Sequence, residues 1–323
     1  MNIPSLPDAQ HPSHPDPQEP SLTKPLQLPP PERLEWPGLA EKNISADVLR
    51  LDRLHPVISG NKWFKLQGYL REALQSPGQP VITFGGPWSN HLIAAACAAR
   101  QQGLTAIGIV RGERPPVLSA TLTAAAAYGM RLEFIARGEY AKKDQPYFLR
   151  RLTDRFPGAY IIPEGGAGPI GIKGSEDILR IGDTSQYTHI LCAVGTGTTL
   201  MGLIRAAGPG QVVIGIPVLK GLDEWSAIDP HSFLTADQKA GARLLTGYHF
   251  GGYARHPPEL LEFMNRWYRE TGVPSDIVYT GKLFFALWDS VRQDLFPAGS
   301  RLLVIHSGGL QGNLSLPPGI LDF

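Results

Sequence analysis

Short apolar segments that are typical of buried strands alternate with longer amphipathic segments that are typical of helices from residue 48 to residue 306. The expected strands lie at 48–52, 80–86, 104–110, 131–135, 159–163, 188–194, 211–218 and 301–306. The expected helices lie at 63–75, 89–103, 118–129, 147–158, 199–208, 258–272 and 282–296. This alternation predicts parallel sheets with helices on both faces. Because the strands are too many for one compact sheet, we expect two α/β domains with a site between them, beyond the carboxyl ends of strands.

Composition excludes several classes of protein. Of the 323 residues, 42% are hydrophobic, and 30 Lys and Arg are balanced by 29 Asp and Glu, so clustered basic charge for a nucleic-acid partner is not expected. No apolar run of about 18 residues predicts a membrane span. The first residues have neither the basic nor the apolar region of a secretory signal, and a cytoplasmic location is predicted. Cys97 and Cys192 lie in apolar runs and are interpreted as buried free thiols, and we assign no metal ligands.

The first 31 residues are rich in Pro, Ser and Gln and poor in aliphatic side chains. Such a segment buries too little apolar surface to offset its ordering entropy. We therefore expect a flexible tail without chemistry, or an arm laid over the surface or over a partner subunit.

Two lysines open the helix expected at 63–75, in the segment SGNKWFKL (59–66). A desolvated lysine amine is a nucleophile or forms a Schiff base with a carbonyl compound, which makes Lys62 a candidate catalytic residue. Lys65 lies three residues along on much the same helix face and is the rival candidate. Without other signals, a solvated lysine at a helix start is the more frequent case.

Two further segments join a strand to a helix start, where backbone N–H groups bind anions. FGGPWSNH (84–91) places Ser89 and Asn90 there, although Ser89 also suits an ordinary N-cap. AVGTGTTLMG (193–202) has the glycines and threonines of a phosphate-binding loop, or of a structural turn. It lacks the lysine of nucleotide hydrolases and the third glycine of the dinucleotide fingerprint, since Leu200 holds that position.

Two segments near the C-terminus carry hydroxyl side chains at expected strand ends. VYTGK (278–282) is expected to end a short strand with Tyr279 and Thr280, and VIHSGGLQGN (304–313) ends the last strand with His306 and Ser307. The glycine-rich segments at 163–166 and 248–255 either line a cleft or turn the chain.

In this order, these segments resemble the 1-aminocyclopropane-1-carboxylate (ACC) deaminase / D-cysteine desulfhydrase family of pyridoxal-phosphate enzymes. The resemblance runs from about residue 48 to residue 312. It implies a tryptophan-synthase-β-like fold (fold type II) of two open twisted parallel-sheet domains. The implied large cofactor-binding domain comprises residues 32–66 and 163–323, and the small α/β domain comprises residues 67–162. It also implies a homodimer and a small amino-acid substrate.

The resemblance also implies roles for individual residues. Lys62 corresponds to the Schiff-base lysine, so Lys65 is assigned only a supporting role. Asn90 corresponds to the residue that binds the ring hydroxyl of the cofactor. Ser89 corresponds to the serine that contacts the substrate carboxylate, a proposed nucleophile in ACC deaminases, and Tyr279 to the active-site tyrosine. The residues that match the phosphate loop are Gly195, Thr196, Gly197, Thr198 and Thr199.

Three positions depart from the pattern of the ACC deaminases. Thr280, at the expected place of the pyridine nitrogen, replaces a glutamate, and Ser307, on the substrate side, replaces a leucine. His91 stands where those enzymes carry a glutamine. D-cysteine desulfhydrases carry small hydroxyl residues at the first two places, so β-elimination of D-cysteine to pyruvate, ammonia and sulfide is favoured over ring opening of ACC.

The alternatives are an ACC deaminase, a D-serine or β-chloroalanine lyase, an amino-acid racemase and a non-catalytic protein that binds a phosphorylated metabolite. A nucleotide-dependent reductase is weakened by the missing fingerprint.

Overall fold

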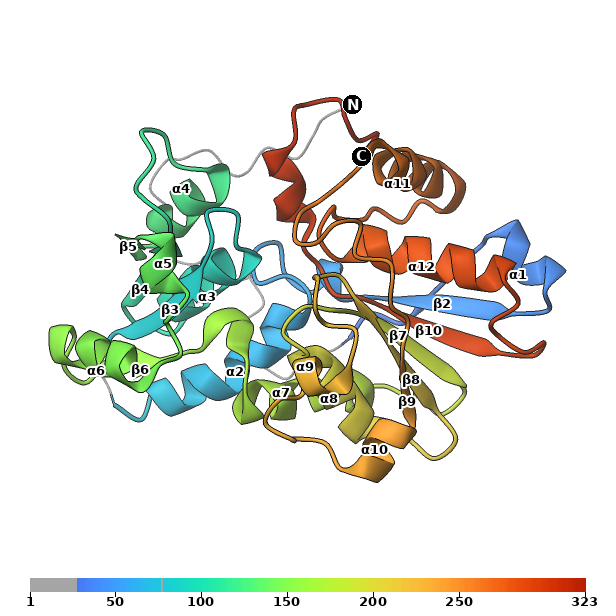
Figure 1. Ribbon diagram of the computed structural model, residues 1–323, viewed down its shortest axis with the longest axis horizontal. Coiled ribbons are helices and arrows are strands. Elements are labelled where there is room, and N and C mark those ends of the chain that lie inside the picture. The colour runs from blue at the N-terminus through green and yellow to red at the C-terminus, as the bar shows by residue number, and fades with distance from the viewer. Residues whose placement is uncertain (1–27, 77) are drawn as a thin grey trace.

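The computed structural model describes residues 28–76 and 78–323, so most of the tail expected at 1–31 lies outside the described residues. The described chain forms two sheets, each flanked by helices (Figure 1). This arrangement confirms the predicted α/β class with parallel sheets.

The larger sheet has six strands, and all neighbouring pairs are parallel except β1 and β2. In spatial order its strands are β1 (Glu32–Arg33), β2 (Ser45–Arg50), β10 (Arg301–His306), β7 (His189–Val194), β8 (Val212–Pro217) and β9 (Ala242–Leu244). The smaller sheet is wholly parallel. Its strands are β5 (Arg131–Ile135), β4 (Ala106–Arg111), β3 (Val81–Gly85) and β6 (Tyr160–Ile161). Each sheet draws on the segments that the sequence assigns to one of the two proposed domains.

The helices of the smaller sheet are α3 (Asn90–Gln101), α4 (Ala120–Ala127), α5 (Arg137–Tyr140) and α6 (Pro146–Arg155). Those near the larger sheet are α1 (Pro37–Glu41), α2 (Asn61–Ala73), α7 (Pro169–Arg180), α8 (Thr198–Ala206), α9 (Trp225–Ile228), α10 (Ala236–Ala240), α11 (Pro258–Thr271) and α12 (Thr280–Arg292). None of the helices in the described ranges combines the length and the apolar character needed to cross a membrane.

Alternate residues of the strands face different cores, as buried parallel strands require. In β10, Leu303 and Ile305 pack in the core with α2, α7 and α8, whereas Leu302 and Val304 pack with α11 and α12. The first of these cores also contains the apolar face of α3, so it continues from the larger sheet to the smaller one. Cys97 and Cys192 are buried in it, as expected.

The sequence did not predict the short helices α1, α5, α9 and α10, nor the twelve-residue helix α7. The segment of α7 carries glycines that weaken its helical signal. The structure gives these glycines a packing role. A Cβ on Gly171 would lie 1.9 Å from the carbonyl oxygen of Gly166, and one on Gly174 would lie 2.2 Å from that of Phe64. The backbone of α7 therefore approaches α2 more closely than any larger residue allows.

The segment 278–282 does not end a strand, which corrects the prediction. Residues 277–279 form a turn, and Tyr279 directly precedes α12. The carboxylate of Asp276 accepts the backbone N–H groups of Val278, Tyr279 and Thr280. A carboxylate that satisfies donors at a helix start stabilises a helix there.

Candidate active site

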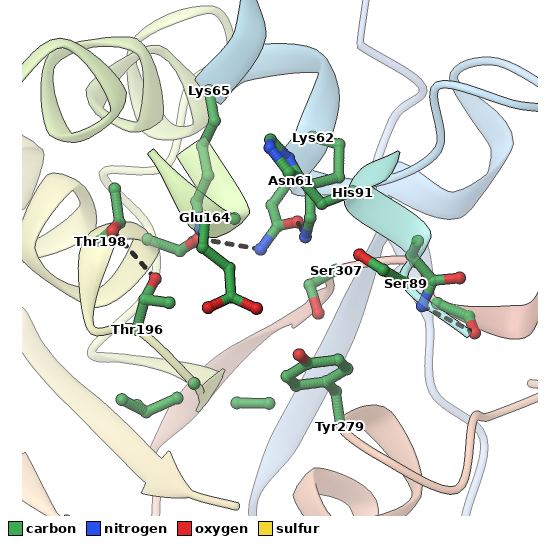
Figure 2. Close-up of a pocket in the computed structure, with 18 of the residues that line it drawn as sticks. Asn61, Lys62, Lys65, Ser89, His91, Glu164, Thr196, Thr198, Tyr279 and Ser307 are labelled. Carbon is green, nitrogen blue, oxygen red and sulfur yellow. Dashed lines mark hydrogen bonds between the residues drawn. The ribbon is translucent and has the colours of Figure 1, made fainter. Parts of the chain in front are cut away.

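A cavity of about 280 Å³ lies where strands of both sheets end (Figure 2). Its walls include residues that follow β3, β7 and β10, together with Arg111 at the end of β4. This is the place where open parallel sheets bind ligands. The predicted site residues that line it are Lys62, Ser89, Asn90, His91, Gly195, Thr196, Gly197, Thr198, Thr199, Tyr279 and Ser307.

Lys62 lies in the first turn of α2, and its Nζ donates to Oδ1 of Asn61 across 2.7 Å. The amide nitrogen of Asn61 in turn donates to Oγ1 of Thr199 across 2.9 Å, which ties α2 to the threonine loop. Burial lowers the pKa of the Lys62 amine to about 8, although the nearby Asp276 carboxylate opposes the shift. A neutral, nucleophilic form of this amine is therefore accessible near neutral pH.

The glycine before Asn61 is required by the geometry. Gly60 has φ +67°, and a Cβ there would lie 1.9 Å from the carbonyl oxygen of Ser307. This close approach brings the start of α2 against the end of β10.

Lys65 also lines the cavity and is almost fully buried. Burial and the charge of Lys62 lower the pKa of its amine far below the ordinary value. In Figure 2 the side chain of Lys65 extends toward the side of Thr198, whereas Lys62 lies beside His91 and Asn61. Both candidate amines thus reach the cavity, on different sides of it.

The start of α3 contributes Ser89 and Asn90. Ser89 is the N-cap, and its hydroxyl accepts the backbone N–H of Leu92 at 3.3 Å. Ser89 is therefore an N-cap, as one of the two interpretations expects. It also lines the cavity. Asn90 donates to the carbonyl oxygen of Gly309 at 3.4 Å, while its buried Oδ1 has no partner. A buried acceptor without a partner is costly, so this oxygen is suited to a donor on a bound molecule.

His91 is a neutral acceptor in the cavity wall. Oγ1 of Thr83 donates its proton to the carbonyl oxygen of Ile162 at 2.9 Å, so its 2.8 Å bond with His91 requires Nε2 of the imidazole to donate. Nδ1 then carries a lone pair, and it is buried without a partner. Burial, with the charges of Lys62 and Lys65, holds the pKa of His91 well below its usual range.

The glycine and threonine loop leads into α8. Gly197 has φ +77°, and a Cβ there would lie 2.7 Å from the carbonyl oxygen of Ile228. The hydroxyls of Thr196 and Thr198 lie 3.0 Å apart. The loop therefore offers hydroxyls and the first N–H groups of a nine-residue helix to the cavity, a combination that suits a phosphate group.

The structure does not bring Thr280 into the cavity. Its hydroxyl is fully buried and bonds with Asp276 on both its donor and acceptor sides. Thr280 is therefore not among the lining residues, and its contact with the cofactor ring stays a prediction. Ser307 faces the cavity instead, and Tyr279 lies near it in Figure 2. Burial raises the pKa of Tyr279 well above its ordinary value, so its phenol is neutral.

Arg111, Glu164 and Tyr253 are among the lining residues that were absent from the predicted site. Glu164 and Tyr253 belong to the two glycine-rich segments for which the sequence allowed two roles, lining a cleft or turning the chain. Arg111 directly follows the strand predicted at 104–110. Its place at a strand end could have indicated that it lies at the site. Oε1 of Glu164 accepts the hydroxyl of Tyr140 across 2.7 Å, and Oε2 pairs with Lys143 at 3.4 Å.

Comparison with known proteins agrees with this geometry. Residues 30–308 match the family described as pyridoxal-phosphate dependent enzyme. A bifunctional D-cysteine desulfhydrase/ACC deaminase of Arabidopsis thaliana is 28% identical over 79% of this chain and 70% of its own. A D-cysteine desulfhydrase of Serratia proteamaculans is 23% identical over 84% of this chain and 89% of its own. A crystal structure described as an ACC deaminase homologue superposes with a TM-score of 0.76 at 28% identity, covering 90% of this chain and 91% of that one.

Proposed function

This chain belongs to the family of pyridoxal-phosphate-dependent enzymes, and we propose that it cleaves D-cysteine with water into pyruvate, ammonia and sulfide. The observation that carries the proposal is the Lys62 amine. It lies in a cavity between two helix starts, and burial brings its pKa to about 8.

Each part of pyridoxal phosphate has a suitable counterpart among the lining residues. Lys62 would hold the aldehyde carbon, and the free Oδ1 of Asn90 would accept the ring hydroxyl. The loop residues Gly195, Thr196, Gly197, Thr198 and Thr199, with the first N–H groups of α8, would hold the phosphate. Lys65, which extends toward Thr198, adds an amine to that side of the cavity.

The substrate carboxylate would bind at the start of α3. The hydroxyl of Ser89 and the N–H groups near Asn90 and His91 face this part of the cavity. An anion at a helix N-terminus is stabilised by those donors and by the helix dipole.

When bound, pyridoxal phosphate supplies an electron sink for the pair left at the α-carbon. The Lys62 amine would serve as the general base that takes the α-proton of the substrate. Tyr279 is a neutral phenol and can donate its proton to a departing sulfur atom. The bond between the β-carbon and sulfur would break as sulfur takes the proton of Tyr279 and leaves as hydrogen sulfide, and one water molecule would then release ammonia and give pyruvate.

We relate substrate choice to Ser307, a small hydroxyl residue of the lining where ACC deaminases carry a leucine, and to the scarcity of carboxylates in the lining. Among the lining residues of the described chain, Glu164 is the sole carboxylate, and Tyr140 and Lys143 engage it. Without a free carboxylate in this lining, the pyridine nitrogen of a bound cofactor would have no partner that keeps it protonated, which would limit charge delocalisation and favour prompt loss of a good β-leaving group. The Arabidopsis relative, named for both activities, makes ACC the second substrate to test.

Two parts of the proposal rest on the resemblance and on sequence composition: a homodimer and a cytoplasmic location. Sedimentation analysis of the purified protein tests the first. Fractionation of the producing cell tests the second.

The experiment is pyruvate release by the cofactor-loaded protein with D-cysteine, L-cysteine, β-chloro-D-alanine, D-serine and ACC in parallel. The proposal expects turnover of D-cysteine, accompanied by sulfide in equal amount, and no turnover of ACC. Turnover of ACC alone would contradict it.

A further inference from the structure

Lys282 is a fully buried lysine on the third residue of α12, and neither the proposed chemistry nor the resemblance gives it a role. Its Nζ donates to three backbone carbonyl oxygens: that of Gly252 at 2.7 Å, that of His249 at 2.9 Å and that of Val218 at 3.3 Å. A cluster of carbonyl oxygens around one positive charge is the coordination that proteins offer to potassium and ammonium ions.

The three carbonyls belong to segments that carry cavity residues. Val218 precedes Leu219, and Gly252 precedes Tyr253; both following residues line the cavity. The helix that carries Lys282 begins just after Tyr279, another lining residue. One ammonium group therefore joins three walls of the cavity.

The energetics favour a charge at this point. An ammonium group supplies one donor to each of the three carbonyl oxygens, whereas a neutral amine supplies only two donors. Burial lowers the pKa of Lys282 to about 8, with Asp276 opposing the shift, so the protonated form predominates at neutral pH. Loss of the ammonium would take the donor from the Val218 carbonyl and leave the His249 and Gly252 carbonyls with one backbone N–H donor each, which would loosen the segment that carries Tyr253.

We propose that Lys282 is a positioning residue whose ammonium group serves as a built-in monovalent cation, holding the Tyr253 segment and the end of β8 against α12. The protein consequently needs no dissolved alkali cation to shape its cavity. The activity arm of the test rests on the proposed function, but the stability arm does not.

The test compares the wild type with Lys282→Ala and Lys282→Met. Alanine opens space in which a dissolved cation can bind the carbonyls, whereas methionine fills that space without a charge. Each protein is measured in potassium chloride, ammonium chloride and tetramethylammonium chloride at equal ionic strength. The readouts are the thermal midpoint of the cofactor-loaded protein and kcat and KM for pyruvate release.

Lys282→Ala should have a higher thermal midpoint in potassium or ammonium than in tetramethylammonium, because an ion that binds the folded state stabilises it. Its kcat should fall by about a hundredfold in tetramethylammonium, as expected for misplaced cavity groups, and recover in potassium or ammonium. Lys282→Met should respond to none of the three salts. The wild type should behave alike in all of them.

Three results would overturn the proposal. They are a Lys282→Ala protein indifferent to the cation, a Lys282→Met protein rescued as well as the alanine variant, and a wild type that needs potassium. The last of these can be measured even if both variants fail to fold. If pyruvate release is absent from every protein, the proposed function fails, while the thermal midpoints still decide the role of Lys282.

Discussion

At the start of α12, the hydroxyl of Thr280 forms two hydrogen bonds with Asp276, one as donor and one as acceptor. Oγ1 of Thr280 donates to Oδ1 of Asp276 across 2.7 Å, and the backbone N–H of Asp276 donates to the same hydroxyl oxygen across 2.7 Å. The hydroxyl is thus fully used inside the fold. Of the three residues that differ from the ACC deaminase pattern, Ser307 and His91 line the cavity and Thr280 does not.

Thr280→Val should therefore destabilise the protein without changing the site. A lost hydrogen bond to a buried carboxylate costs about 1.5–3 kcal/mol, measurable by urea unfolding. Ser307→Ala, the matched variant, should alter substrate preference and the absorbance of the bound cofactor while leaving the free energy of unfolding nearly unchanged. A Thr280→Val protein with normal stability and altered cofactor absorbance would show that Thr280 does contact the ring.

Ser89 has a capping role and a proposed substrate role, and two substitutions separate them. Ser89→Ala removes both and should cost about 0.5–2 kcal/mol of stability, whereas Ser89→Gly costs only a few tenths because glycine is a tolerable N-cap. If the hydroxyl contacts substrate, both variants should lose activity to a similar extent despite their different stabilities. If the loss of activity instead parallels the loss of stability in the two variants, Ser89 acts only as the N-cap of α3.

The lowered pKa of Lys62 predicts how cofactor capture depends on pH. Below pH 8 the amine of the cofactor-free protein is protonated and unreactive, and above it the neutral form predominates. The rate of covalent cofactor capture should therefore rise with pH through a midpoint near 8, measured by absorbance after mixing. A midpoint near the ordinary lysine value of 10.5 would show that the amine is not desolvated.

The glycines of α7 predict a contrast in stability. Gly174→Ala places a Cβ 2.2 Å from the carbonyl oxygen of Phe64 and should cost about 1–3 kcal/mol through overpacking. Gly182→Ala is the control, because no atom lies within 4 Å of its Cβ position. Thermal unfolding of the two variants compares them directly. Equal midpoints would contradict the close approach of α7 to α2.

Most strands and the longer helices other than α7 could be predicted because their apolar periodicity is local, whereas the short strands β1 and β9 were not predicted. Helix α7 could not be predicted, since Gly171 and Gly174 lower its helical signal for the sake of contacts with residues far away in sequence. The cavity lining was predictable where a motif marks a helix start, as at Lys62, Asn90 and the loop from Gly195 to Thr199.

The sequence could not show which hydroxyl faces the cavity. Thr280 and Tyr279 are adjacent, and only the capping of α12 by Asp276 turns one inward and the other toward the site. Tyr253 and Lys282 are likewise linked by backbone carbonyls, which carry no residue-specific signal.

The central claim is that Lys62, rather than Lys65, carries the cofactor. The most direct measurement is borohydride reduction of the cofactor-loaded protein, followed by proteolysis and mass spectrometry of the lysine that retains the cofactor. The account predicts the label on Lys62 in the wild type and in Lys65→Ala, and no label in Lys62→Ala. A label on Lys65 in the wild type would contradict the assignment.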